Sequence, residues 1–218
     1  MYAVYQVVQY LMLRVEMIIQ MDRETLLKIV EKLSSCKDIQ LSDIPCIDLY
    51  VDQVTTLFDD KLGDTKREPS EKVLTKTMIN NYTKSRIIMP PKNKKYNKNH
   101  MILLSLIYNL KQILSINDIK LLFDPLFNRT NSSKGVLKED LDELYNAYLT
   151  IKEGDMESIS SYFNDVFDHV LSISSETVKD TNNDKQTLIL LVLALAAQAA
   201  FNKRLAESII DEYFKVEK

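Results

Sequence analysis

Basic residues crowd into one short segment of the chain. Eight lysines and arginines lie between Lys72 and Lys98 with no aspartate or glutamate among them, so this segment carries a local charge of +8. Charge of this density favours a polyanionic partner such as DNA. Residues 139–218 hold sixteen acids and seven bases, and the whole chain has a net charge of −3. The summed charge therefore hides a strongly positive segment.

The first part of this segment, residues 75–86, has the pattern of an amphipathic helix. At 100° per residue, Met78, Ile79 and Tyr82 share one side. The opposite side carries no carboxylate, and its polar residues are Lys76, Thr77, Asn80 and Lys84, with Asn81 at the edge. Lysine can contact phosphate or guanine, asparagine can pair with adenine, and threonine can contact phosphate or the thymine methyl group. The pattern predicts a helix that enters the major groove, whereas a merely solvated face is the alternative for the helix taken alone.

A second basic stretch follows the predicted helix. Pro90 and Pro91 end the helix, because proline cannot continue it. The residues expected to hold flanking phosphates or the minor groove are Lys92, Lys94, Lys95 and Tyr96, with added charge from Arg86 and Lys98. A helix beside a basic wing would supply base contacts and backbone anchoring from adjacent pieces of chain.

These residues belong to a stretch, 74–123, that resembles the MerR family of transcriptional regulators. Four elements carry the resemblance: Asn81-Tyr82 at the aromatic pair, Ile87–Pro91 at the leucine–proline helix exit, Tyr96-Asn97 at the start of the next helix, and Leu114–Ile119 at the final serine–acid element. The resemblance implies a winged helix–turn–helix that binds duplex DNA, with its first helix at Asp48–Leu62.

Several departures from the MerR pattern limit what carries over. Thr77 and Asn80 stand where the family has arginines, and Arg86 stands where it has a helix-ending glycine. The wing is shorter, Gly63–Val73 replaces a tight turn, and the dimerisation coiled coil with its cysteine metal site has no counterpart. Base preference is therefore not implied. Residues 44–123 also resemble a family from low-GC Gram-positive bacteria that is described only as a domain of unknown function, which implies a bacterial, repressor-like regulator.

The composition favours an all-α fold. Three glycines and five prolines in 218 residues leave few turns, as expected for long helices. We expect an apolar extension at 1–20 that lacks the features of a signal peptide and could precede the native start, a helix–turn–helix domain with extra N-terminal helices at 21–124, and an acidic helical domain at 136–218.

The acidic domain is expected to mediate dimerisation or to bind a small-molecule or protein effector. Its helices are predicted near 138–152, 155–174 and 184–214. The apolar run at 188–200 is shorter than the ~20 residues of a membrane span, so a buried core helix and no membrane contact are expected.

No pattern of catalytic or metal-binding residues stands out. The cysteines, Cys36 and Cys46, are ten residues apart, and His100 and His169 lie on separate predicted helices. A reducing compartment, hence the cytoplasm, fits these thiols. We expect no enzyme activity, cofactor or metal, and we expect duplex DNA as the partner of a homodimer.

Two other interpretations stay open at this point. The same basic helix could make the chain an adaptor that binds an acidic protein. A single-strand or RNA binder would need exposed aromatic residues for stacking, and Tyr96 is the candidate.

Overall fold

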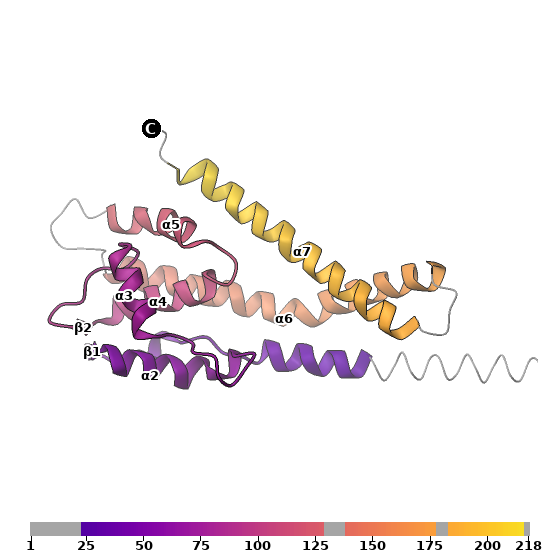
Figure 1. The fold of residues 1–218 in the computed structure, drawn as a ribbon, viewed down its shortest axis with the longest axis horizontal. Coiled ribbons are helices and arrows are strands. Elements are labelled where there is room, and N and C mark those ends of the chain that lie inside the picture. Colours follow the sequence, from indigo (N-terminus) through magenta and orange to yellow (C-terminus); the bar gives the residue numbers. More distant parts are fainter. Residues whose placement is uncertain (1–22, 129–137, 178–182, 216–218) are drawn as a thin grey trace, which may run out of the picture. The chain divides into compact units, whose positions relative to one another are not determined.

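The computed structural model describes residues 23–128, 138–177 and 183–215 (Figure 1). The predicted extension at 1–20 lies outside the described residues. Helices dominate the described chain, and the one sheet found there has two short strands. This confirms the all-α class in its broad form.

The chain divides into two compact units. Their described residues are 23–35, 155–177 and 183–197 for the first unit, and 36–128, 138–154 and 198–215 for the second. The elements in chain order after the helix at 23–34 are η1 (Leu41–Asp43), β1 (Leu49–Tyr50), α2 (Val51–Leu62), η2 (Gly63–Thr65), α3 (Lys76–Lys84), β2 (Lys95–Tyr96), α4 (Lys98–Leu110), α5 (Ile116–Asn128), α6 (Lys138–Thr177) and α7 (Asn183–Tyr213).

The second unit is built around α4. Every side chain from His100 to Ile107 is buried. Phe58 of α2, Ile79 of α3 and Ile119 of α5 belong to the same core, and each is completely buried. The core thus fixes the positions of α2 and α3, which carry the candidate site.

Side chains cap the starts of three helices in the second unit. The Thr75 hydroxyl accepts from the Met78 amide at 3.2 Å, and Asn97 Oδ1 accepts from the His100 amide at the same distance. Ser115 and Asp118 form a reciprocal box, in which each side chain accepts from the backbone amide of the other at 3.2 Å. Each bond satisfies an amide that has no partner within its helix.

Several predicted helix boundaries are wrong. The helix predicted at Asp48–Leu62 begins at Val51, because Leu49 and Tyr50 pair with β2 as a strand. The helices predicted at 138–152 and 155–174 form one continuous helix, α6, through Gly154. A glycine inside a helix costs only about 1 kcal/mol, which the flanking helical residues can offset. Helix α5 continues through Pro125 to Asn128, beyond the end of the domain predicted at 21–124.

The first unit has a smaller core, made by Phe163, Phe167 and Val170 of α6 with Leu191 of α7. The helix at 23–34 packs Leu26, Leu27 and Val30 against it. Ile29 and Leu33 of the same helix are 50% and 66% exposed. Only one stripe of this helix therefore faces the core.

The prediction that the apolar run of α7 is a buried core helix is wrong. Leu191 is buried, but Val192 and Leu193 are 65% and 59% exposed. The reason is that apolar residues surround this helix, while the first unit offers a core on one side only. Among the described residues, Lys185–Tyr213 is one helix whose length and composition would allow it to cross a membrane.

Candidate nucleic-acid interface

Helix α3 separates its apolar and polar residues as the sequence predicts. Ile79 and Tyr82 are buried in the core of the second unit, and Met78 is half-buried. The exposed residues of α3 include all the candidates on its polar side: Lys76, Thr77, Asn80, Asn81 and Lys84. The core contacts of one side therefore hold the other side outward.

The end of α3 is a tight left-handed turn centred on Arg86. The Ile87 amide donates to the Tyr82 carbonyl at 2.9 Å, and the Arg86 amide donates to the Thr83 carbonyl at 3.0 Å. This pair of bonds defines a Schellman motif, in which the residue at the Arg86 position is usually glycine. Arg86 has φ 58° and an exposed side chain. An arginine thus occupies a conformation that favours glycine.

The basic wing is a small hairpin. The Lys95 amide donates to the Lys92 carbonyl at 2.9 Å, and these two residues form a bridge. Between them, Asn93 and Lys94 have φ 52° and 62°. Two consecutive left-handed residues are the mark of a type I′ hairpin turn, whose second position usually holds glycine. Lys92 and Lys94 are exposed, so the turn points two ammonium groups away from the core.

The first turn of α2 connects the helix and the wing. Strand β1, which leads directly into α2, pairs antiparallel with β2, and Tyr50 lies opposite Lys95. Lys95 Nζ lies 5.2 Å from the centre of the Tyr50 ring. Lys76 at the start of α3 forms an ion pair with Asp52. The exposed and half-exposed residues of α3, of its C-terminal turn and of the hairpin are called the basic face below: Lys76, Thr77, Asn80, Asn81, Lys84, Arg86, Lys92, Lys94 and Lys95.

Two predicted site residues lie outside the basic face. Tyr96 is only 4% exposed and packs edge-to-face on His100 with 5.3 Å between ring centroids. Its predicted contact with phosphates, and its use as an exposed stacking ring, are therefore wrong. Burial raises the pKa of its hydroxyl. Lys98 is half-buried and forms an ion pair with Asp142 of α6 at 2.7 Å. Its charge is neutralised within the protein and adds little to the face.

Sequence reasoning missed Asp52. The polar side of α3 itself has no carboxylate, as predicted, but α2 places one beside Lys76. The two residues are separated by a long polar loop, so no pattern of spacing along the chain could have paired them. The contact depends on how α2 and α3 pack on their common core.

Comparison with protein families gives a match over the part of the chain that carries the basic face. Residues 39–148, just over half of the chain, match the family described as Domain of unknown function (DUF1836). The chain belongs to this family. The chain matches no curated protein and no solved structure. The DUF1836 region includes α2 to α5, both strands and the first residues of α6.

His100 serves the DUF1836 region as a buried structural residue. Its Nδ1 accepts from the Asn97 amide at 3.2 Å, and its Nε2 lies 3.1 Å from the Met89 carbonyl oxygen. The ring thereby ties the exit of α3 to the start of α4. Burial lowers the pKa of the imidazole, and the bond to Met89 partly opposes this shift. Across the described ranges, no group of three or more His, Cys, Asp or Glu side chains could hold a metal ion.

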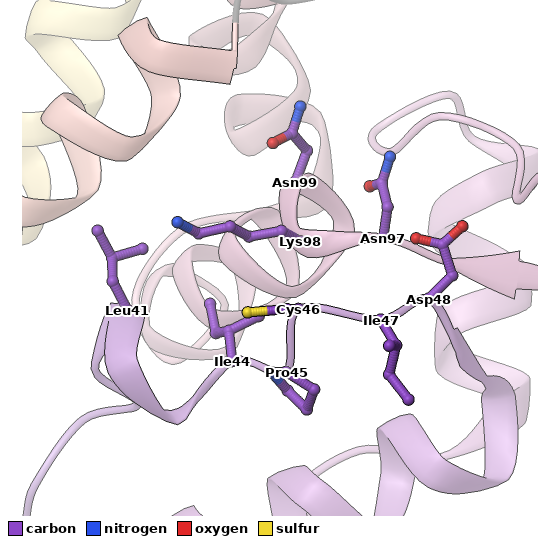
Figure 2. Close-up of a pocket in the computed structure, with 9 residues that line it drawn as sticks. All are labelled: Leu41, Ile44, Pro45, Cys46, Ile47, Asp48, Asn97, Lys98 and Asn99. Atoms are coloured by element: carbon purple, nitrogen blue, oxygen red, sulfur yellow. The ribbon is translucent and has the colours of Figure 1, made fainter.

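The DUF1836 region also contains a cavity of about 310 Å³. It lies between residues 41–48 and the start of α4, and Figure 2 shows Lys98 extending along it with Cys46 nearby. Apolar Leu41, Ile44 and Pro45 form part of the wall, and Asp48 and Asn97 add polar atoms. The lining thus combines apolar side chains with polar atoms and the thiol of Cys46.

Proposed function

We propose that this chain is a bacterial, cytoplasmic transcriptional regulator that binds duplex DNA sequence-specifically through its basic face. In this proposal the DUF1836 region acts as a MerR-like winged helix–turn–helix, with α2 and α3 as the helix pair and residues 92–95 as the wing. Occupancy of an operator would repress the adjacent gene. The observation that carries the proposal is the placement of two exposed cations, Arg86 and Lys94, at left-handed positions.

The strain at these two positions favours a role for the charge. A residue with a Cβ costs about 1–2 kcal/mol in the left-handed region, whereas glycine adopts it freely. Neither side chain is buried, so packing offers no compensation. A strained residue at an exposed position indicates that the side chain serves a function and does not stabilise the fold. A long cationic side chain that reaches a phosphate would meet that requirement.

The dimensions of the basic face suit duplex DNA. Helix α3 has nine residues, which makes it about 14 Å long, and the major groove admits one helix. Thr77 and Asn80 would face base edges, while Lys84 and the wing would contact phosphates on the flanks. One short helix contacts few base pairs, so we propose a homodimer on an operator with two half-sites. The acidic helical region would provide the dimer contact or bind an effector.

Fluorescence anisotropy across a salt series tests the phosphate contacts. The variant Lys92→Ala, Lys94→Ala should bind every duplex more weakly, and the slope of log K against log salt should fall by about 1.8, since each lost phosphate contact lowers it by about 0.9. A matched control is Lys185→Ala, Arg204→Ala, which removes the same charge from exposed positions of α7. A slope that is equal in the two variants would remove the wing from the proposal.

A second variant, Asn80→Ala, tests base contacts separately. It should weaken binding to a duplex selected from a random library by about 5- to 150-fold, the equivalent of one good bidentate base contact at 1–3 kcal/mol. Binding to random duplex and the salt slope should change little. If the wild-type chain binds no duplex even at low salt, DNA recognition is refuted, and the adaptor that binds an acidic protein becomes the better hypothesis.

A further inference from the structure

We infer that Asp52 is a specificity-determining residue, which pairs with Lys76 and so opposes binding to arbitrary duplex sequences. The inference rests on the proposed function, since it assigns a role within the same basic face. The observation behind it is the ion pair between Lys76 Nζ and Asp52 Oδ1, which joins the first turns of α3 and α2.

Asp52 lies on a short piece of chain that contacts both α3 and the wing. Two residues before it, Tyr50 lies under the ammonium group of Lys95 in the wing. One short piece of chain therefore contacts α3 through Asp52 and the wing through Tyr50. A DNA backbone that bridged α3 and the wing would pass close to the carboxylate. Among the described residues, Asp52 is the one acid that forms an ion pair with a cation of the basic face.

Because the ion pair is exposed, the Asp52 carboxylate competes with phosphate for Lys76, and the pair contributes little to the stability of the fold. The Lys76 and Asp52 side chains are 57% and 70% exposed, so water screens their attraction and the pair adds little to folding. A phosphate that approaches Lys76 must displace the carboxylate or bind beside its negative charge. Lys76 therefore adds less to non-specific binding than an unpaired lysine of the same helix, such as Lys84.

A suitable operator sequence can accommodate the Asp52 carboxylate in the major groove. Asp and Glu side chains accept a hydrogen bond from the amino group of cytosine in the major groove. A cytosine opposite the start of α3 would give Asp52 a donor. Guanine and thymine present acceptors in the major groove and would repel the carboxylate, as a phosphate would. An element that disfavours wrong partners increases specificity even when it lowers overall affinity. The expected operator therefore has a cytosine near the N-terminal end of α3.

The test compares Asp52→Asn with Asp60→Asn in the full chain. Asp60 is an exposed residue of the same helix with no ion pair in the described structure, so both variants lose one negative charge from α2. For random duplex at low salt, Asp52→Asn should raise affinity about fivefold and increase the salt slope by about 0.9, because Lys76 gains a phosphate. Asp60→Asn should leave the slope unchanged. The ratio of selected to random affinity should fall only in Asp52→Asn.

A second comparison uses the lysines and does not depend on the Asp52 variant folding. Lys76→Ala should change random-duplex affinity little, whereas Lys84→Ala should weaken it and lower the salt slope by about 0.9. In the double variant Asp52→Asn, Lys76→Ala, the gain of Asp52→Asn should disappear.

The outcomes separate this inference from the proposed function. Equal effects of Asp52→Asn and Asp60→Asn, or equal losses for Lys76→Ala and Lys84→Ala, would overturn the role of Asp52 while leaving DNA binding intact. A wild-type chain that shows no salt-dependent duplex binding would refute the proposed function itself.

Discussion

Replacement of Arg86 by glycine should make the protein more stable and weaken its binding to DNA. The residue has φ 58° at the end of α3, where a side chain with a Cβ costs about 1–2 kcal/mol. Glycine removes this strain but gains about 0.5–1 kcal/mol of freedom in the unfolded chain. The net gain for Arg86→Gly is therefore about 0.5–1 kcal/mol. For a chain of this size the melting temperature should rise by about 1–4 °C.

Urea denaturation followed by circular dichroism measures this gain, with Arg86→Ala as the matched control. The alanine variant loses the guanidinium group but keeps the Cβ, so its midpoint should stay close to that of the wild type. Both variants should lose one phosphate contact and lower the salt slope by about 0.9. Stability should therefore separate the two variants while DNA binding does not. A glycine variant no more stable than the alanine variant would refute the argument from strain.

Two buried polar side chains give further expectations. Burial lowers the pKa of His100, so the folded state takes up a proton on this ring less readily than the unfolded state. The free energy of unfolding should therefore be level above about pH 6.5 and should fall as the pH drops below it. His100→Gln should reduce this fall, and a pH profile unchanged from that of the wild type would contradict the assignment. The Tyr145 hydroxyl donates to the buried Ile39 carbonyl at 2.6 Å, and burial raises its pKa to about 12, so it remains a donor. Tyr145→Phe should cost about 1–3 kcal/mol in urea denaturation, and an unchanged midpoint would contradict the importance of this bond.

The sequence was a good guide to structure where the deciding contacts are local. Thr75, Asn97 and Ser115 each cap a helix through a backbone amide three residues ahead, so the relevant partner is always near in the chain. The same holds for the two sides of α3, because a helix repeats every 3.6 residues whatever surrounds it. Such regularities predict α3 and the start of α4 from the sequence alone.

Features that depend on partners distant in the chain were predicted poorly. Tyr96 turns inward because it lies opposite Leu49 in the sheet, and a strand of two residues is too short to show alternation in its sequence. Helix α6 continues through Gly154, whose local preference against helix is small compared with the contribution of its neighbours. The apolar run of α7 predicted burial, but burial also requires enough facing side chains, and the first unit supplies them on one side only.

The basic face illustrates both kinds of information at once. Counted along the sequence, residues 72–98 carry a charge of +8. In the structure, Asp52 and Asp142 form ion pairs with Lys76 and Lys98. The ammonium group of Lys95 lies over the ring of Tyr50. The basic-face cations that form no ion pair within the described structure are Lys84, Arg86, Lys92, Lys94 and Lys95. They gather at the C-terminal end of α3 and in the wing, where they also offset the negative end of the helix dipole. The attraction for DNA phosphates should therefore be strongest at the C-terminal end of α3. Phosphates held there would anchor the DNA backbone and leave Thr77 and Asn80 to contact the bases.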